Sequence, residues 1–333
     1  MGALDELVTD ERTGRVALAC ATEPGDILTS RLVARVGAVE TMRLATASGV
    51  VPGMDRASAG VWRQHLSERL SPERIERAFT DTARAGMQLL LPTDRNWPVG
   101  LDSLGEYAPL ALWVAGNSDA LRTTIVNRVA VIGSRACTDY GTAVAAELAG
   151  DIAYKGRHIV TTGAYGIGTA ALRGPLSRDA LGATIVVLPA GLDRLYPAGN
   201  QDLLERARDA GTLLSELPPG SAPTRWRFQQ RDLVVAAISK ATVVVEAGAR
   251  SGALTAAADA AALGRGVGAV PGPVDSPTSY GTNRLLREGV AKMITSASDV
   301  LDLITGRERT LEARNITGLS QLTTARDHAG RSL

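Results

Sequence analysis

The stretch from Arg128 to Gly141, RVAVIGSRACTDYG, determines how the rest of the chain is interpreted. A run of β-branched residues leads into the turn Gly133-Ser134-Arg135, and a segment of helical character follows from about Thr138. This order predicts a buried strand, a turn and a helix N-terminus, where unpaired N–H groups and the helix dipole favour an anion such as phosphate. We expect a hydroxyl and a guanidinium in the turn to hold that phosphate.

The same order of strand, turn and helix repeats as far as residue 305. Strands are expected at VAVIG 129–133, HIVTT 158–162, ATIVVLP 183–189, TLLSEL 212–217, ATVVVEA 241–247, VGAVPG 267–272 and AKMIT 291–295. Helices are expected over 142–154, 169–178, 201–209, 233–238, 254–263, 283–287 and 298–304. Apolar strands that alternate with helices predict an α/β fold with a parallel sheet covered on both faces. In such sheets ligands bind beyond the carboxyl ends of the strands.

The remaining segments differ in character. Residues 1–85 carry apolar residues at helical spacing, with Ser71-Pro72 as a helix start, and predict a small helical domain. Residues 86–127 hold a short strand at 89–92 and a second apolar run at 110–116, and we interpret them as the joint between domains. Trp97 and Trp113 in this joint could stack on bases, but packing is the better explanation. The polar stretch 306–333 is typical of a flexible tail.

Composition narrows the function classes. The 333 residues include 36 basic and 35 acidic side chains, so any nucleic-acid contact must come from a local patch. Cys20 and Cys137 are far apart and lack metal-ligand spacing, which favours a reducing compartment and predicts no metal site. No apolar run approaches the ~18 residues of a membrane span, and the N-terminus lacks a signal-peptide pattern. We expect a cytoplasmic protein with no membrane contact and no cofactor.

Further turns in the α/β region have the composition of anion sites. Gly163 and Gly166 follow the second strand, where glycine lets backbone amides approach a ligand. Other turns place small polar and basic residues at helix starts: Arg250, Ser251 and Gly252 after the fifth strand, and Thr282, Asn283 and Arg284 near residue 281, with Thr282 as N-cap. Several helix N-termini at one sheet edge predict a phosphate-rich ligand.

The segment RWRFQQR, residues 225–231, interleaves basic and aromatic residues, and we expect it to form a loop. Single-stranded nucleic acid favours this composition, because cations meet the backbone and rings stack on bases. The alternative is an amphipathic loop whose rings pack on the core.

Candidates for catalysis are few. The three histidines, His65, His158 and His328, are scattered and suggest no triad or metal cluster. Glu246, Glu216 and Asp193 lie near strand ends and could act as general bases, although surface and capping roles are commoner for such acids. We therefore predict no catalytic residue.

A set of motifs in a fixed order resembles the DNA-processing protein A (DprA/Smf) family. The motifs are GSR 133–135, PAGLDRLYP 189–197, SELPPG 215–220, VEA 245–247 with RSG 250–252, VPG 270–272 and GTN 281–283. The joint, with GMQLLLPTDRNWPVGLDSL 86–104 and LWVAGN 112–117, and the helical front resemble the family as well. The resemblance implies an extended Rossmann-like parallel-sheet domain over 128–305 preceded by a small helical domain.

The resemblance also implies a function and a site. It suggests a non-enzymatic protein that binds single-stranded DNA, forms a homodimer and helps load a RecA-type recombinase during DNA uptake and natural transformation. By the family's pattern, Arg135 and the basic block with Arg227, Phe228 and Arg231 would contact DNA. Pocket-lining residues would be Gly133, Ser134, Gly163, Gly166, Arg250, Ser251, Gly252, Thr282, Asn283 and Arg284.

The chain departs from the family's pattern at two places. Where the family has Gly-Ile-Asp and Ala-Ala-His, this chain has Gly168 and Leu172 in place of the acid and the histidine. Where the family tends to read Phe-Pro-x-Arg-Asn-Arg, Asp232 and Leu233 replace the last two residues. An acid replaces a neutral side chain and a cation is lost, so we expect weaker DNA binding and a salt dependence that is flatter by about one unit of slope.

Two other functions stay open on sequence grounds. One is a nucleotide-binding sensor or an enzyme that resembles the nucleoside-monophosphate phosphoribohydrolases, with Glu246 as the acid and the helix start at Ser251-Gly252 as the phosphate site. The other is a regulatory partner that keeps only protein contacts.

Overall fold

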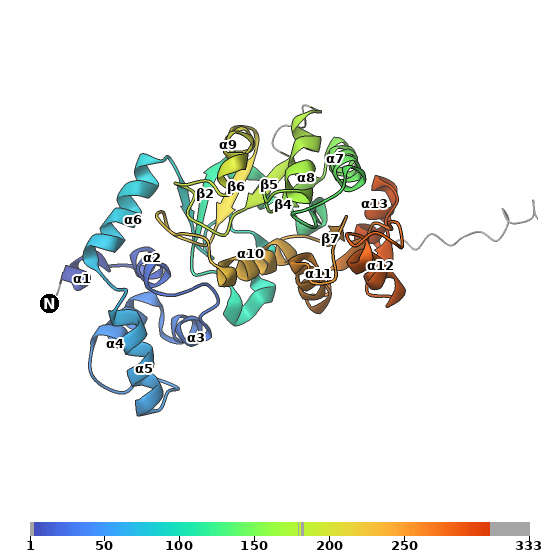
Figure 1. Cartoon of the computed structure of the whole chain (residues 1–333). Helices are drawn as coiled ribbons and strands as arrows, with labels where there is room; N and C mark the ends of the chain where they lie inside the picture. The colour runs from blue at the N-terminus through green and yellow to red at the C-terminus, as the bar shows by residue number, and fades with distance from the viewer. Residues whose placement is uncertain (1–2, 179, 181–182, 307–333) are drawn as a thin grey trace, which may run out of the picture.

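The computed structural model describes residues 3–178, 180 and 183–306, so the expected tail lies outside the described residues from position 307 onward. Its centre is a nine-stranded sheet with the order β1-β2-β6-β5-β4-β3-β7-β8-β9 (Figure 1). The strands are β1 Gln88–Leu90, β2 Leu112–Gly116, β3 Arg128–Ile132, β4 His158–Thr161, β5 Thr184–Val187, β6 Thr212–Ser215, β7 Ala241–Val244, β8 Gly266–Ala269 and β9 Lys292–Met293. The seven strands from β6 to β9 in this order run parallel, whereas β1 and β2 are antiparallel additions at one edge.

The chain reverses its direction of travel across the sheet at β3. Val129 of β3 is paired with Ile159 of β4 on one side and with Ala241 of β7 on the other. The turns that leave β3 and β7 therefore separate toward opposite faces, which opens a crevice beyond the carboxyl ends of these strands. The crevice lies where the sequence predicts the ligand site.

Helices cover both faces of the sheet (Figure 1). The face with α7 Asp139–Tyr154, α8 Ile167–Leu176 and α13 Ala297–Thr305 buries Val129, Val131 and Val243. The opposite face buries Ala130 and Ile132 under α10 and α11. The other helices of this region are α9 Gln201–Ala210, α10 Arg225–Ala237, α11 Gly252–Ala262 and α12 Tyr280–Arg287. Alternate strand residues thus face opposite layers, as the period of a β-strand requires.

Six helices precede the sheet, with the bounds α1 Ala3–Leu7, α2 Glu11–Ala21, α3 Ile27–Val36, α4 Ala38–Thr46, α5 Arg56–Ser67 and α6 Pro72–Arg84. The start of α6 agrees with the sequence, because the Ser71 hydroxyl accepts the Arg74 N–H and Pro72 occupies the first turn. The segment interpreted as a joint contributes β1 and β2 to the sheet. Trp97 and Trp113 are buried, at 6% and 1% exposure, and the Trp113 indole donates to the Thr82 hydroxyl at 2.9 Å. Both rings therefore pack rather than offer a stacking surface.

The two helices α7 and α8 approach each other so closely that glycine is required between them. A Cβ on Gly174 would lie 2.1 Å from the Ala146 carbonyl oxygen. Gly174→Ala should lower the free energy of unfolding by about 1–3 kcal/mol, because the backbone of α7 has no flexible group to move aside. Denaturant unfolding of the purified protein measures this loss.

Gly60 in α5 provides the matched control. A Cβ there meets nothing within 4 Å, so Gly60→Ala should stabilise the protein by roughly 0.5–1 kcal/mol. Equal effects of the two substitutions would contradict the close approach of α7 and α8.

Candidate functional site

A groove with a volume of about 900 Å³ lies at the carboxyl ends of β3 and β7. Its walls are the turns after β3, β4 and β7 and the first turns of α10 and α11. The lining residues are Ile132–Ala136, Thr162, Ala164, Tyr196, Pro223–Arg225, Phe228, Gln229, Arg231, Asp232, Gly248, Arg250–Ala253 and Thr255. Eight predicted site residues from segments far apart in the sequence meet here: Gly133, Ser134, Arg135, Phe228, Arg231, Arg250, Ser251 and Gly252.

Four arginines line the groove. Arg135, Arg225 and Arg250 are exposed, and none of them forms an ion pair with the described residues. Arg231 is different, since its side chain is only 7% exposed, its Nε lies 2.8 Å from Oδ1 of Asp232, and its Nη1 donates to the Thr162 carbonyl. Three exposed guanidinium groups without ion pairs to described residues therefore line the groove.

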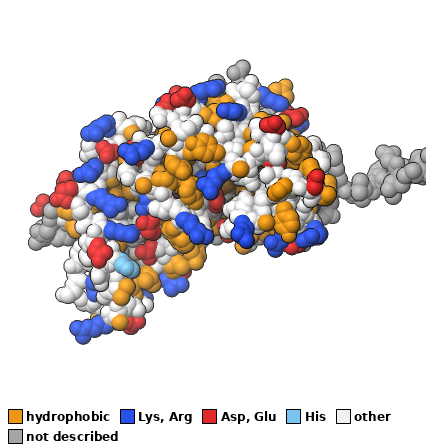
Figure 2. Space-filling model, in the orientation of Figure 1, with side chains coloured by type: hydrophobic (Ala, Val, Ile, Leu, Met, Phe, Trp, Pro, Cys, Tyr) orange, Lys and Arg blue, Asp and Glu red, His pale blue; other side chains and the backbone are white. Residues whose placement is uncertain are grey.

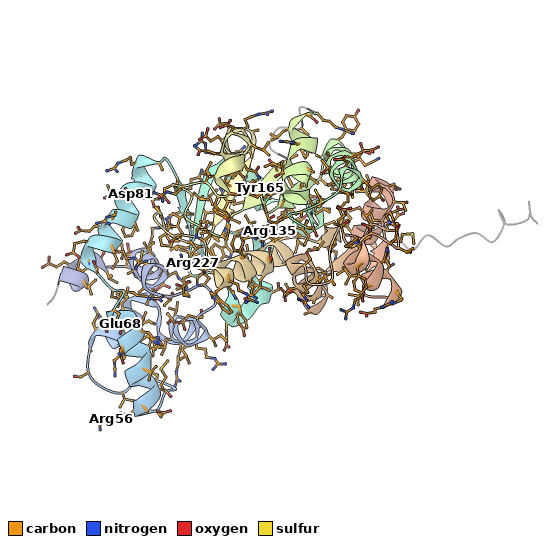
Figure 3. The ribbon with its side chains drawn as sticks, viewed as in Figure 1. Arg56, Glu68, Asp81, Arg135, Tyr165 and Arg227 are labelled. Atoms are coloured by element: carbon orange, nitrogen blue, oxygen red, sulfur yellow. The ribbon has the colours of Figure 1, made fainter. Side chains whose placement is uncertain are left out.

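Phe228 stands between two of these cations. Its ring centroid is 5.9 Å from the guanidinium carbon of Arg135 and 5.4 Å from that of Arg231, and Tyr196 meets it edge-on at 5.8 Å. A smaller cavity of about 80 Å³ adjoins this cluster and is also lined by Tyr165 and Pro197. Figure 3 places Arg135 over the middle of this face with Tyr165 nearby, and Figure 2 shows basic and hydrophobic side chains next to each other near its centre. Cations that flank an aromatic ring suit a ligand with both phosphates and flat rings.

The turn after β3 is held by hydrogen bonds on three sides. The Ser134 N–H donates to the Glu246 carbonyl at 2.8 Å, the Gly248 N–H donates to the Ser134 hydroxyl, and the Ile167 N–H donates to the Ser134 carbonyl. Gly166 has a φ of 70°, and a Cβ on it would lie 2.4 Å from the carbonyl oxygens of Ser134 and Arg135. Gly166 therefore supports the turn from behind.

The N-terminus of α7 differs from the expected phosphate site, because a carboxylate of the protein already fills it. Oε2 of Glu246 accepts the Thr138 N–H at 2.9 Å, and Oε1 accepts the hydroxyls of Thr138 and Thr278 at 2.6 and 3.1 Å. A Cβ on Gly141 would lie 2.3 Å from this carboxylate. Glu246 is 2% exposed and completes the fold here, so it is not placed as a general base.

Six predicted site residues lie outside the groove: Gly163, Gly166, Arg227, Thr282, Asn283 and Arg284. Gly163 packs against Leu204 and Val186. Because α12 begins at Tyr280 with Ser279 as N-cap, Thr282 is not the predicted N-cap, and its hydroxyl donates to the Ser279 carbonyl.

The last two of these residues have local partners. Asn283 bridges the backbone N–H and carbonyl of Gly272, and Arg284 pairs with Glu288 one turn along α12. The GTN motif therefore fixes the loop after β8 rather than the groove wall.

The predicted loop over 225–231 is instead the start of α10, and the sequence expectation of a helix from 233 was too short. Thr224 is the N-cap, with its hydroxyl accepting the Arg227 N–H. The spacing of Arg225, Phe228 and Asp232 follows one face of this helix, which lines the groove. The sequence analysis did not identify Arg225 as a groove residue. Thr224 as an N-cap and the helical spacing of these residues are the signals that predict it.

The opposite side of α10 contacts the N-terminal helices. Arg227 forms a two-pronged ion pair with Glu23, at 2.9 and 3.0 Å, and the Trp226 indole donates to the Pro24 carbonyl at 2.8 Å. Figure 3 shows Arg227 at the end of α10 that is nearer these helices. Arg227 is therefore committed within the protein.

The four positions that depart from the family's pattern lie in different parts of the structure. Gly168 and Leu172 are buried on α8, and Leu233 on α10 packs against the core. Among the four altered positions that the structure describes, only Asp232 lines the groove.

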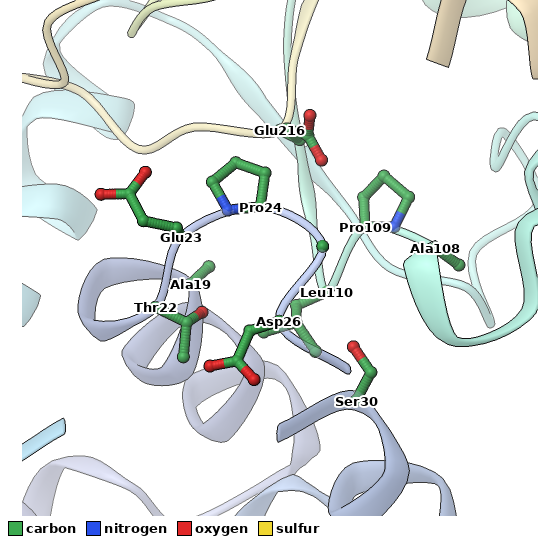
Figure 4. Close-up of a pocket in the computed structure, with 11 residues that line it drawn as sticks. Ala19, Thr22, Glu23, Pro24, Asp26, Ser30, Ala108, Pro109, Leu110 and Glu216 are labelled. Atoms are coloured by element: carbon green, nitrogen blue, oxygen red, sulfur yellow. The ribbon is translucent and has the colours of Figure 1, made fainter. Parts of the chain in front are cut away.

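A small cavity at the base of the N-terminal helices, which is shown in Figure 4, has a volume of about 20 Å³. This is room for about one water molecule, so it is not a ligand site. Glu216 projects into it beside Pro24 and Pro109 (Figure 4). Burial raises the pKa of the Glu216 carboxyl to about 8, and the nearby Arg227 opposes this rise only in part.

No helix in the described ranges is long and apolar enough to cross a membrane. In the same part of the chain, histidine, cysteine, aspartate and glutamate form no group of three or more that could hold a metal ion.

The fold and the groove together define an extended Rossmann-type protein with arginines and a phenylalanine at the switch point of its sheet. The chain belongs to the DNA recombination-mediator protein A family, whose model matches residues 88–305. It is 41% identical over 270 residues to a putative DNA processing protein DprA of Mycobacterium tuberculosis, an alignment that covers 77% of this chain and 68% of that relative. The predicted family and the predicted α/β fold are confirmed.

Solved structures agree with this assignment. DNA processing protein A from Streptococcus pneumoniae matches with a TM-score of 0.69 at 27% identity, over 86% of this chain and 95% of that one. DNA processing protein A from Helicobacter pylori, whose structure concerns its single-stranded DNA binding mode, matches with a TM-score of 0.59 at 27% identity, over 66% of this chain and 96% of that one.

The pKa of Glu216 predicts a pH dependence of stability. The folded-state pKa of about 8 lies above the ordinary value of 4.5, so between these pH values the folded protein holds a proton that the unfolded chain releases. Stability should therefore fall as pH rises through this interval, and Glu216→Gln should flatten the fall and raise the melting temperature near pH 8. Thermal unfolding at several pH values across the interval measures this loss of stability. Glu68→Gln is the control, because it removes the same charge from an exposed position. Matching profiles for wild type and Glu216→Gln would refute the assignment.

Proposed function

We propose that this chain is a recombination mediator that binds single-stranded DNA in the groove at the switch point of its sheet. The observation that carries the proposal is that Arg135, Arg225 and Arg250, which are exposed without ion pairs to described residues, line one groove together with the ring of Phe228, over which Arg135 lies. Arginines fit phosphates in pairs of hydrogen bonds, and a ring stacks on any base. Membership in the recombination-mediator family and the binding mode of the Helicobacter pylori relative support the same ligand.

The chemistry of the groove favours binding with little sequence preference. Its polar groups include guanidinium groups, which suit phosphates, beside hydroxyl and amide side chains, and its aromatic groups have faces that accept every base. Affinity should therefore depend strongly on salt, because each neutralised phosphate releases counterions.

A non-enzymatic role is part of the proposal. The acid that a nucleotide hydrolase of this fold would need is Glu246, and its carboxylate already accepts three hydrogen bonds from Thr138 and Thr278. Nothing in the geometry favours the nucleotide-hydrolysing alternative over strand binding.

The remaining features of the proposal are supported by the family. We infer that the protein acts in the cytoplasm as a homodimer and passes the strand to a RecA-type recombinase. We also propose a division into a helical domain over 1–85, a joint over 86–127 that extends the sheet, and a DNA-binding domain over 128–305.

Removing one groove cation should weaken binding in a salt-dependent way. Arg135→Ala and Arg250→Ala should each raise Kd for a labelled single strand by about tenfold at low salt and reduce the slope of log Kd against log salt by about 0.7. Fluorescence anisotropy at several salt concentrations measures both quantities. Arg56→Ala removes the same charge from an exposed position on α5, and an equal loss in this control would refute the groove as the binding site.

The ring of Phe228 should contribute through stacking. Phe228→Leu keeps an apolar side chain between Arg135 and Arg231 but removes the flat face, and should cost about 1–3 kcal/mol of binding free energy. The salt slope should stay at its wild-type value, because no cation is lost. A changed slope with unchanged low-salt affinity would contradict a stacking role.

A further inference from the structure

A carboxylate of the protein lies inside the groove, among the cations that face the ligand. Oδ1 of Asp232 lies 2.8 Å from Nε of Arg231, and the Asp232 side chain is 20% exposed. A Cβ built on Gly252 would lie 3.8 Å from Oδ2, so the carboxylate also reaches the first turn of α11. Its two oxygens thus lie beside a guanidinium and a helix N-terminus, which are the surroundings that a phosphate group would seek.

Arg231 is held by this contact. Its Nε faces Asp232, its Nη1 donates to the Thr162 carbonyl, and its guanidinium lies over the ring of Phe228. While Asp232 is charged, it satisfies the buried cation, and a phosphate that approaches Arg231 meets a like charge at close range.

We propose that Asp232 is an internal competitor for the DNA phosphate, and that strand binding at Arg231 and the α11 N-terminus requires this carboxylate to become neutral. The inference rests on the proposed function, because it concerns how the same groove admits the strand. It assigns to Asp232 the role of setting the affinity of the groove and its response to pH.

The charges around Asp232 come from three elements. Arg231 lies on α10 itself, Arg135 lies on the turn after β3, and Asp259 lies on α11. Burial raises the pKa of Asp232 above its ordinary value, and the two arginines only partly oppose this rise. The pKa of Asp259 is likewise raised, by burial and by the charge of Asp232.

The direction of the pH effect follows from these groups. A phosphate beside Asp232 favours its neutral form, so DNA binding takes up a proton and affinity rises as pH falls toward the Asp232 pKa. Arginine and the phosphodiester do not titrate in this range, and no histidine of the described ranges lines the groove. Among the described residues at the groove, Asp232 and its neighbour Asp259 have raised pKa values that can produce the effect.

The test compares wild type, Asp232→Asn and Glu76→Gln. Asn keeps the shape of Asp232 but cannot carry its charge, whereas Glu76→Gln removes one charge from an exposed position on α6, outside the groove. Binding of a labelled single strand of about 35 nucleotides is measured by anisotropy from about pH 8 to about pH 5.5 at constant low salt. Thermal unfolding of each variant at both limits verifies the fold.

Wild-type affinity should rise several-fold toward the lower pH, with at most about tenfold gained per pH unit. Asp232→Asn should bind about tenfold tighter than wild type near pH 8 and lose most of the pH dependence, while Glu76→Gln should follow wild type. Wild-type binding that is independent of pH, or weaker binding by Asp232→Asn, would overturn the inference and make Asp232 a residue that positions Arg231. If no variant binds at any pH, the proposed function itself fails, and the inference fails with it.

Discussion

The carboxylate of Glu246 is the contact on which the arrangement of the site depends. It follows β7, yet it satisfies the backbone N–H and the hydroxyl of Thr138 at the start of α7, while the backbone carbonyl of the same residue accepts the Ser134 N–H. These hydrogen bonds hold the turn after β3 and the turn after β7 together where they leave the sheet, and the two turns diverge only beyond this point. A buried carboxyl group with three donors is stable where it is; Gly141 leaves the space that this group needs, and Gly133 leaves space for the backbone carbonyl of the same residue.

These hydrogen bonds of Glu246 also change which part of the glycine turn after β3 is available to a ligand. In a sheet of this type the first helix N-terminus commonly receives a ligand phosphate, but here an acid from the protein takes that place. The cations that remain available come from the rim of the crevice, on the turns after β3 and β7 and on the first turn of α10. A rim of this kind suits a long polyanion that lies across the sheet edge better than a mononucleotide that would insert under it.

The helix α10 links the two halves of the molecule, and it also shows what the sequence could and could not predict. The order of strands and helices followed from apolar runs and turn residues, since those signals are local. The extent of α10 did not, because its first two turns mix arginines and glutamines with two aromatic residues: one face lines the groove with Arg225 and Phe228, and the other pairs Arg227 with Glu23. Neither face has the apolar stripe by which an amphipathic helix is recognised, and the partner of Arg227 lies some two hundred positions away in the chain.

The groove residues of the GSR and RSG turns were predicted correctly because one edge of the sheet collects the carboxyl ends of parallel strands. The residues of the GTN motif were assigned to the same edge, although they fix a neighbouring loop.

The near-neutral composition of the chain is compatible with a polyanionic ligand, because the charges are distributed unevenly in space. Many arginines outside the groove have carboxylate partners, as Arg12 has in Asp94 and Arg31 in Glu106, and such pairs contribute little field beyond a few ångströms. Arg135, Arg225 and Arg250 have no such partner among the described residues and line one concave surface, where field lines are concentrated. Among the described residues Asp232 is the one acid that lines this surface; burial raises its pKa whereas Arg231 and Arg135 lower it, so its ionisation responds to any further charge that enters the groove. A net charge of +1 for the whole sequence is therefore compatible with a local excess of positive charge at the groove.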